Sequence, residues 1–263
     1  VLPLTARGSG RGTSGGAISK GAIISLSAHM NSVFEYDEKQ KLVRLQPGAS
    51  IEAVQSALAL RGTGIMALDG LDSRGTIGGA IADNAAGYMS AKYGSLDENV
   101  SQLEVVLANG DVLQTGKISK KEFNRKKGLQ GLEGDIYRGV DAVLEEFADE
   151  IKTIHEQDNT GYNAIARVKQ KDGGVDLTPL FLGSQGTLGI ISEMILSAEF
   201  RSQHQDLAAL VFASANAARD ALDKIRSLNP AFLQYFDAAL FDRAVQAGHA
   251  LPWFQALGDG LAP

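Results

Sequence analysis

The chain of 263 residues is long enough for one large domain, or for one domain and part of a second. Its hydrophobic fraction of 44% and charged fraction of 21% are ordinary for a globular protein. A net charge of −6 argues against nucleic acid as a partner, because phosphate binding favours a basic surface. The absence of cysteine excludes disulfides, iron–sulfur clusters and cysteinyl-linked cofactors, and no apolar run is long enough to be a transmembrane segment.

The first part of the chain is expected to alternate short strands and short helices. Aliphatic runs predict strands at residues 22–26 and 42–45. Ser50 then provides a suitable N-cap for a helix that continues through Leu60. The Gly- and Ala-rich stretch 76–84 predicts a further short helix.

The middle of the chain carries a hairpin signal and a long helical pattern. Strands at residues 103–108 and 112–114 flank Asn109-Gly110, which predicts a tight turn with positive φ at both central residues. The basic stretch 117–127 is expected to be a solvated loop. Apolar spacing over residues 136–154 predicts one long helix.

The last part of the chain changes in composition. Short strands are expected at residues 180–182 and 190–196, on either side of a glycine turn. Glycine is then absent from Ile190 to Ala247, which places a domain boundary near residue 200. The tail predicts a strand–helix–strand–helix order, typical of a small α+β lobe, over residues 207–213, 215–227, 232–236 and 238–248.

The glycines fall in clusters, and the first has the sequence Arg7-Gly-Ser-Gly-Arg-Gly-Thr-Ser-Gly-Gly16. Glycine allows sharp turns and close approach to a ligand, and successive N–H groups form a concave site for an anion such as a diphosphate. Arg7 and Arg11 can add positive charge. A nicotinamide fingerprint is excluded, because Thr13 stands at the third glycine position and a strand follows; no P-loop lysine is present either. The alternative is a purely structural turn.

Two further clusters have the same character. Residues 70–87 place Thr76, Gly78 and Gly79 at a helix start, where N–H groups are expected to point outward and small residues let a flat ring lie against the backbone. The third cluster, residues 183–190, is preceded by Asn159-Thr-Gly-Tyr162. Close helix packing and a simple turn are the respective alternatives.

Together and in this order, the clusters resemble the FAD-binding domain of the vanillyl-alcohol-oxidase-type (PCMH-type) flavoproteins. The resemblance is closest to the branch of glycolate oxidase flavin subunits and FAD-linked D-lactate and D-2-hydroxyacid dehydrogenases. It implies an α+β fold with two FAD-binding subdomains over residues 1–200, with an incomplete N-terminal lobe. Residues 201–263 are expected to begin an α+β cap domain for the substrate. Since the chain starts at Val1, close to the first glycine loop, and stops in a loop, we expect a piece of a longer protein, truncated at both ends.

The resemblance also implies which residues bind the cofactor. The first loop would surround the diphosphate, the second cluster would follow the ribityl chain and flavin, and the third would close the site, with Tyr162 leading toward the flavin. FAD is expected to be non-covalent, because Arg11 stands where relatives have Thr or a flavin-linked His; Gln185 stands where relatives often have Glu. The expected cofactor residues are Arg7, Gly8, Ser9, Gly10, Arg11, Gly12, Thr13, Thr76, Ile77, Gly78, Gly79, Ala82, Asn84, Gly87, Tyr162, Gly186, Thr187, Gly189 and Ile190.

The activity that the resemblance implies is FAD-dependent oxidation of a small-molecule D-2-hydroxy acid, of lactate or glycolate type, by hydride transfer to flavin N5. No catalytic residue is assigned, and the base and the carboxylate-binding group are expected beyond Pro263. No metal site is expected, because the four histidines, His29, His155, His204 and His249, show no ligand spacing.

Several alternatives remain open at this point. The chain can instead be a non-catalytic FAD-binding or electron-transfer subunit of a multi-subunit oxidase. A cell-wall amino-sugar reductase and a protein without flavin are further alternatives. The electron acceptor is unknown, and a cytoplasmic location is expected, with peripheral membrane association of the intact protein as the alternative.

Overall fold

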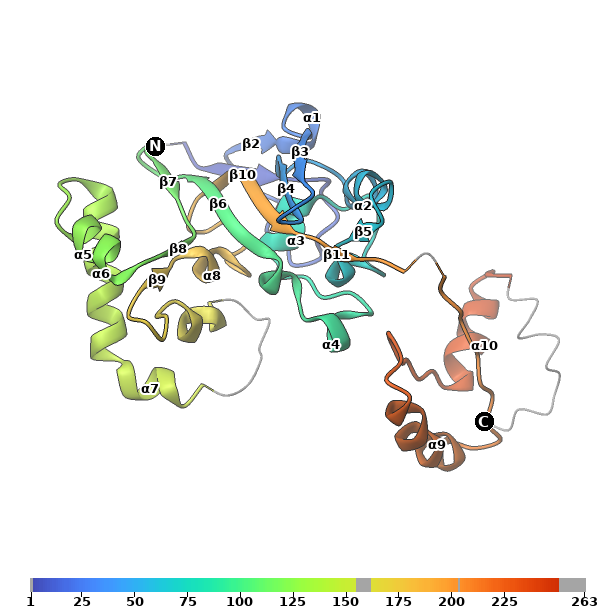
Figure 1. Cartoon of the computed structure of the whole chain (residues 1–263). Helices are drawn as coiled ribbons and strands as arrows, with labels where there is room; N and C mark the ends of the chain where they lie inside the picture. The colour runs from blue at the N-terminus through green and yellow to red at the C-terminus, as the bar shows by residue number, and fades with distance from the viewer. Residues whose placement is uncertain (1, 155–161, 203, 251–263) are drawn as a thin grey trace. The chain divides into compact units, whose positions relative to one another are not determined.

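The computed structural model describes residues 2–154, 162–202 and 204–250. The chain divides into two compact units, Val1–Arg201 and Ser202–Pro263 (Figure 1). The predicted segment Asn159–Gly161 and His155 lie outside the described residues. In the part of the chain that is described, no helix has both the length and the apolarity to cross a membrane.

The first unit is built around a five-stranded antiparallel sheet in the order β3-β4-β10-β6-β7. Strand β10, from the far end of the unit, lies between β4 and β6, so the sheet joins distant parts of the chain (Figure 1). The strands predicted near residues 42–45 and 190–196 are confirmed. The five strands are β3 (Val33–Asp37), β4 (Leu42–Leu45), β10 (Ile190–Ser197), β6 (Val100–Val106) and β7 (Val112–Gln114).

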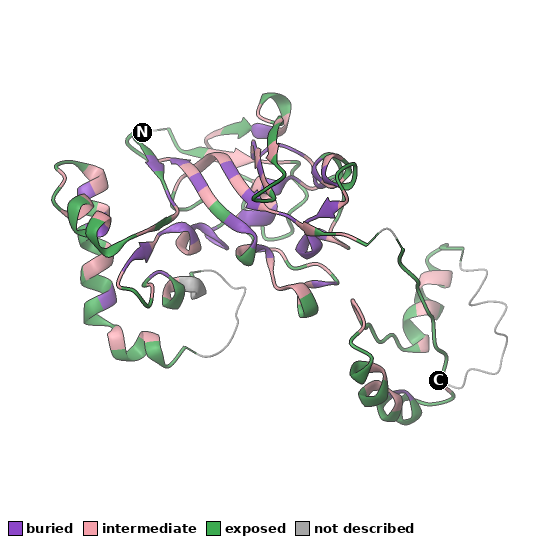
Figure 2. Ribbon diagram, in the orientation of Figure 1, coloured by how far each residue is buried: buried purple, intermediate pink, exposed green. Residues whose placement is uncertain are grey.

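The two faces of this sheet differ in polarity, as the alternation of side chains along a strand requires. On one face Leu45, Leu103 and Met194 pair across β4, β10 and β6 and are fully buried (Figure 2). On the other face the Arg44 guanidinium donates to both carboxylate oxygens of Glu193, at 2.5 and 2.9 Å. The sheet therefore has one core face and one polar face.

Short helices supply the rest of the core. Helix α2 (Ile51–Ala59) buries Ile51, Val54 and Leu58, a helical spacing. The Ser50 hydroxyl accepts a hydrogen bond from the Ala53 amide at 3.1 Å, which confirms the predicted N-cap. The neighbouring elements are the parallel pair β1 (Leu4–Arg7) and β2 (Ala22–Ser25), α1 (Leu26–His29), β5 (Thr63–Gly64), η1 (Met66–Leu68), α3 (Ile77–Ala82), α4 (Ser90–Tyr93) and η2 (Leu96–Glu98).

The hairpin between β6 and β7 is confirmed, but its turn is of another type than predicted. Gly110 has a φ of +90°, whereas Asn109 does not have positive φ. The Leu107 amide donates to the Asp111 carbonyl at 2.8 Å, and the Gly110 amide donates to the Leu107 carbonyl at 2.9 Å. A longer loop with one left-handed glycine therefore replaces the two-residue turn.

The basic stretch predicted to be a loop is in fact strand β8 (Lys117–Ile118) followed by helix α5 (Lys120–Lys127). The missed signal is the N-cap Ser119, whose hydroxyl accepts from the Glu122 amide at 3.3 Å. Phe123 is buried against Tyr137, with ring centroids 6.1 Å apart, and so anchors α5 on the next helix.

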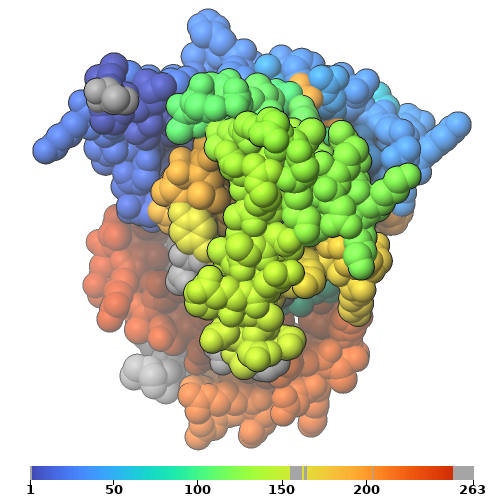
Figure 3. Space-filling model, turned by 90° about the vertical axis from the view of Figure 1, so that its left-hand side faces the viewer, coloured from blue at the N-terminus to red at the C-terminus, as the bar shows by residue number. Residues whose placement is uncertain are grey.

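The single helix predicted over residues 136–154 is also wrong, because the structure has two. Helix α6 (Leu132–Glu146) ends at Phe147, whose φ and ψ of −106° and 26° interrupt the helix before α7 (Ala148–Lys152). Ile151 still packs against the core, so the apolar spacing continues across the break without a continuous backbone. Figure 3 views this side of the molecule and shows α5 to α7 as a yellow-green ridge.

Residues 180–182 were predicted as a strand, but Leu180 and Phe181 belong to the helical turn α8 (Thr178–Phe181) and Leu182 follows it. Pro179 occupies the first turn, and the Asp176 carboxylate accepts from the Thr178 amide at 2.8 Å, so local groups favour a helix start. A short apolar run alone does not distinguish the two states. The other elements here are η3 (Asn163–Arg167), β9 (Val175–Asp176), which pairs with β8, and β11 (Glu199–Phe200), which pairs with β5.

The second unit contains the two predicted helices, α9 (Ala215–Ser227) and α10 (Ala238–Gln246). The Ser214 and Asp237 side chains cap them by accepting from the Ala217 and Leu240 amides. The strands predicted at residues 207–213 and 232–236 are not formed, and in this part of the described chain their backbones have no strand to pair with. An extended segment needs such a partner to become a strand.

Candidate functional site

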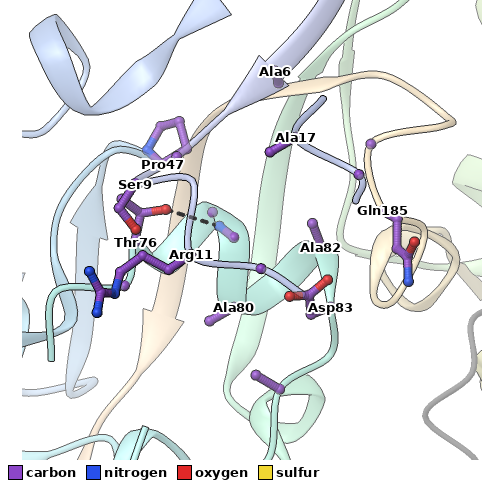
Figure 4. Close-up of a pocket in the computed structure, with 18 of the residues that line it drawn as sticks. Ala6, Ser9, Arg11, Ala17, Pro47, Thr76, Ala80, Ala82, Asp83 and Gln185 are labelled. Carbon is purple, nitrogen blue, oxygen red and sulfur yellow. Dashed lines mark hydrogen bonds between the residues drawn. The ribbon is translucent and has the colours of Figure 1, made fainter. Parts of the chain in front are cut away.

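Residues from all three glycine clusters line one cavity of about 330 Å³ in the first unit (Figure 4). Gly10, Gly78 and Gly186, one from each cluster, share its wall. Small residues predominate, so the wall is mostly backbone. The expected cofactor residues found in the wall are Gly8, Ser9, Gly10, Arg11, Gly12, Thr76, Gly78, Gly79, Ala82, Gly186 and Gly189.

The first loop contacts the second cluster directly. A Cβ atom on Gly8 would lie only 2.0 Å from the Thr76 Oγ1 atom, so no larger residue fits without moving the loop. Thr76 is itself buried, and its hydroxyl accepts from the Gly79 amide at 3.3 Å as the N-cap of α3. A glycine at position 8 therefore brings the loop against the start of the helix.

The same loop presents backbone donors to the solvent. Within the described chain, the amides of residues 9–14 donate to no protein acceptor. Gly10, with a φ of +68°, and Gly15, with a φ of +81°, give the loop a curvature that L-residues rarely adopt. A run of unpaired amides along a curved, exposed backbone is the geometry that receives an anion.

The two arginines of the loop have different roles. The Arg7 guanidinium donates to the Ala17 carbonyl at 3.0 Å through Nε and at 2.7 Å through Nη2, which ties together the two ends of the loop. Arg7 does not line the cavity, so its charge holds the loop rather than facing a ligand. Arg11 lines the cavity, and its Nε donates to the Asp72 carboxylate.

The expectation that the start of α3 points free amides outward is wrong. The Ile77 amide donates to the Ala49 carbonyl at 2.9 Å, and the Gly78 amide donates to the Pro47 carbonyl at 2.8 Å. The Gly79 amide is taken by Thr76. The first turn of α3 is thus docked onto the segment before α2, and the donors for an anion come from the first loop.

The third cluster is joined to the other end of α3. The Gly183 amide donates to the Ile81 carbonyl at 3.1 Å, and the Gln185 amide donates to the Ala82 carbonyl at 2.9 Å. Gln185 lines the cavity with a φ of +52°, a strained value for a residue with a side chain. These bonds satisfy carbonyls at the helix end and fix the third loop beside the cavity.

Eight of the expected cofactor residues lie outside the cavity wall. Ile77 and Asn84 are buried in the core, and Gly87 packs so closely that a Cβ atom would lie 2.1 Å from the Asp69 carbonyl oxygen. Tyr162 is half-exposed, and its hydroxyl is hydrogen-bonded to Thr187 Oγ1. The residues not in the wall are Arg7, Thr13, Ile77, Asn84, Gly87, Tyr162, Thr187 and Ile190.

Two acidic residues in the wall, Asp72 and Asp83, were not predicted. Burial beside the cavity raises the pKa of the Asp83 carboxyl above its ordinary value. The pKa of Asp72 is lowered, chiefly because the Arg74 amide donates to its carboxylate, and also because of Arg11. In Figure 4 the Arg11 guanidinium is directed away from Asp83, which directly follows α3. Both aspartates stand inside the quoted motifs, but a glycine pattern does not show which polar side chains will face inward.

Two other unpredicted wall residues come from segments without glycine signatures. Pro47, which precedes α2, and Phe181, in α8, border the cavity. Only the folding of distant segments onto α3 brings them there, so no local pattern could have found them. The described residues contain no group of side chains that could hold a metal ion.

The residues of this cavity fit a flat cofactor that carries a diphosphate. Its volume lies within the usual range of about 300–1,000 Å³ for ligand pockets. The curved loop offers unpaired amides for phosphate oxygens, and the glycine- and alanine-lined wall leaves room for a ring against the backbone. The cofactor residues predicted from the sequence meet here for the most part, in one place.

Comparison with known proteins agrees with this geometry. Residues 1–116 match the family model described as the FAD binding domain. The chain is 30% identical over 199 residues to the D-2-hydroxyglutarate dehydrogenase of Pseudomonas putida, covering 74% of this chain and 20% of that protein. It is 28% identical over 239 residues to the glycolate oxidase subunit GlcD of Bacillus subtilis, covering 90% of this chain and 40% of that protein.

A solved structure shares the fold. An alkyldihydroxyacetonephosphate synthase superposes with a TM-score of 0.55 at 18% identity, covering 87% of this chain and 34% of that one. The chain thus spans well under half the length of these relatives. Over residues 1–116 the chain carries an FAD binding domain, and in sequence it is similar to a D-2-hydroxyglutarate dehydrogenase and to a glycolate oxidase subunit.

Proposed function

We propose that the protein binds FAD non-covalently in the cavity between its three glycine clusters and acts in the oxidation of a D-2-hydroxy acid. The observation that carries the proposal is the meeting of Gly10, Gly78 and Gly186 around one cavity beside a loop of unpaired amides. When bound, FAD would supply flavin N5 as the acceptor of the hydride that leaves a 2-hydroxy acid as it is oxidised to a 2-oxo acid.

In this proposal the first loop receives the diphosphate. The amides of residues 9–14 donate to phosphate oxygens, while Arg7 holds the loop closed through Ala17. Arg11 adds a positive charge at the wall. Gly79 and Ala82 on α3 would leave room for the ribityl chain and ring against the helix, while Gly78 lets the helix pack on Pro47, whose Cβ atom would lie 2.6 Å from an added Cβ. The third loop, with Gly186 and Gly189, closes the other side.

The remaining expected residues support the site from behind. Ile77 and Asn84 stabilise α3 from the core, Gly87 allows close packing, and Tyr162 with Thr187 anchors the third loop. Residues 1–200 form the FAD-binding domain in this proposal, and residues 201–263 begin the cap domain; the division of the chain into two units at residue 201 supports this. No residue of the described chain is proposed as the catalytic base.

The substrate class is supported by the relatives, which are named as a D-2-hydroxyglutarate dehydrogenase and a glycolate oxidase subunit. The compounds in the two names, D-2-hydroxyglutarate and glycolate, are both 2-hydroxy acids. The second relative is one subunit of an oxidase, which favours an alternative: the protein is a non-catalytic FAD-binding or electron-transfer subunit.

The proposal is tested on the purified full-length protein by its absorption spectrum, then by adding D-2-hydroxy acids, first alone and afterwards with an artificial electron acceptor. The expected result is bound flavin that heat or acid releases, and whose absorption bands bleach with D-lactate, glycolate or D-2-hydroxyglutarate when neither oxygen nor another acceptor is present. Bound flavin that no hydroxy acid bleaches would favour the subunit alternative. A protein that neither retains nor rebinds FAD would overturn the proposal.

A further inference from the structure

A cluster of three charged residues lies at the wall of the cavity. The Arg11 Nε donates to Asp72 Oδ2, and the Arg74 Nε lies 3.5 Å from Asp72 Oδ1. The Arg74 amide also donates to Asp72 Oδ1 at 3.1 Å. Asp72 is thus shared between the glycine loop on one side and its own turn on the other.

The charge balance of the wall makes this cluster important. Among the described wall residues Arg11 is the only cation, whereas Asp72 and Asp83 are both acidic. An FAD diphosphate is itself anionic, so two carboxylates oppose it and one guanidinium attracts it. In the structure that guanidinium is held by a carboxylate.

The pair has the properties of an exchangeable contact. The side chains of Arg11 and Asp72 are 37% and 42% exposed, and ion pairs of such exposure contribute little to stability. Within the described chain, the two terminal nitrogens of Arg11 donate to no protein acceptor, so they remain available to a second anion. When Arg11 leaves, the Asp72 carboxylate still has the Arg74 amide and guanidinium as partners, so its negative charge stays paired.

We propose that Asp72 is a positioning residue that competes with the FAD diphosphate for Arg11 and thereby weakens cofactor binding. This rests on the proposed function. Asp72 holds Arg11 at the edge of the cavity, and the incoming diphosphate takes over the guanidinium while Arg74 retains Asp72. The affinity for FAD is then set by the exchange between two anions and not by Arg11 alone.

The test is titration of the flavin-free protein with FAD, followed by flavin fluorescence, and with ADP, followed by calorimetry. Asp72→Asn should tighten both by roughly fivefold, the effect of about one exposed ion pair. Asp83→Asn is the matched control, because it removes the same charge from the wall without freeing Arg11, and it should have a smaller effect. Riboflavin, which has no phosphate, should bind Asp72→Asn and the unaltered protein equally.

The coupling between the two residues is measured in a double-mutant cycle. In an Arg11→Gln background, Asp72→Asn should lose its advantage over Asp83→Asn, because no guanidinium remains to be released. Arg11→Gln should cost more affinity in the Asp72→Asn protein than in the unaltered one. Asp72→Ser, whose hydroxyl can still accept from the Arg74 amide, provides the same test if Asp72→Asn fails to fold.

Three outcomes separate the possibilities. Equal effects of Asp72→Asn and Asp83→Asn, or additive effects in the cycle, would overturn the competition while leaving the proposed function intact. Weaker ADP binding in Asp72→Asn would do the same. Failure of the unaltered protein to bind FAD or ADP would overturn both proposals together.

Discussion

Gly8 lies against Thr76 so closely that a Cβ atom at position 8 would come within 2.0 Å of the Thr76 hydroxyl oxygen. The contact joins the loop that offers amides to an anion with the helix that forms the floor of the cavity. Gly8→Ala is therefore expected to displace the loop and abolish FAD retention, measured as flavin absorbance per protein after gel filtration. Gly16→Ala is the control in the same loop, since its Cβ atom would meet nothing nearer than Ser14 Oγ at 3.8 Å. Equal flavin content in both variants would contradict the role of this contact.

Thr76 provides a test of charge at the same place. Thr76→Asp keeps a good N-cap for α3 but adds a carboxylate beside the expected diphosphate, so flavin retention should be lost while the circular dichroism spectrum is kept. Thr76→Asn has nearly the same shape without the charge and should retain part of the flavin. If both variants bind FAD as the unaltered protein does, Thr76 does not face the phosphates.

Gly79 tests the approach of the cofactor to α3. A Cβ atom at this position would contact only the Thr76 hydroxyl, at 3.2 Å, and Gly79 lines the cavity. Gly79→Val should fill the space above the helix and prevent flavin retention while the chain still folds. Unchanged flavin content would place the cofactor elsewhere.

Helix α6 offers a prediction on stability that is independent of the cavity. Gly139 is exposed within the helix, and an added Cβ atom would meet nothing within 4 Å, so Gly139→Ala should stabilise the protein by about 0.5–1 kcal/mol. At Gly134 the Cβ atom would lie 2.0 Å from the Leu129 carbonyl oxygen, so Gly134→Ala should destabilise it. Urea unfolding of the two variants should give opposite signs.

An ion pair between a buried carboxylate and a half-exposed guanidinium gives a larger effect. Asp97 is only 3% exposed, accepts from the Ser95 hydroxyl at 2.6 Å, and pairs with Arg167. Arg167→Ala leaves this carboxylate buried without its cation and should lower the free energy of unfolding by about 2–4 kcal/mol. Lys152→Ala, which breaks the exposed pair with Asp149, should change it by less than about 0.5 kcal/mol. Similar losses in the two variants would show that the burial of Asp97 has no energetic weight.

Asp83 should make stability depend on pH. Its folded-state pKa is raised by burial, so its contribution is fully present below the ordinary value of 3.8 and is lost as pH rises through the folded-state pKa. Asp83→Asn removes the carboxyl whose ionisation lowers the free energy of unfolding. The variant should therefore be more stable than the unaltered protein at neutral pH, and the difference should shrink toward acidic pH. Chemical denaturation at several pH values measures it. A difference that stays constant over the whole range would exclude titration of Asp83 as its cause.

The sequence predicted what local chemistry determines. The cap at Ser50, the helix that begins after Thr76 and the helix over residues 215–227 all follow from short-range signals, and the structure has them. The resemblance that the three glycine clusters carry predicted a shared cavity, although Gly78 and Gly87 serve close packing against Pro47 and Asp69. Where local signals conflict, as at Pro179 in α8, the apolar run alone gave the wrong state.

What the sequence could not predict depends on contacts between distant segments. The Ala49 and Pro47 carbonyls take the amides of α3, and the Asp72 carboxylate meets Arg11, only after the chain has folded. The strands predicted at residues 207–213 and 232–236 had the right composition, but a strand is defined by its neighbour.

The docking of the first turn of α3 on Pro47 and Ala49 has a consequence for the binding and release of the flavin. Because the first turn of this helix completes its hydrogen bonding with protein groups, we expect the helix to stay folded without an occupant. Flavin can then depart and return without the core unravelling. We therefore expect that the folded protein can release its flavin and be reconstituted with modified flavins.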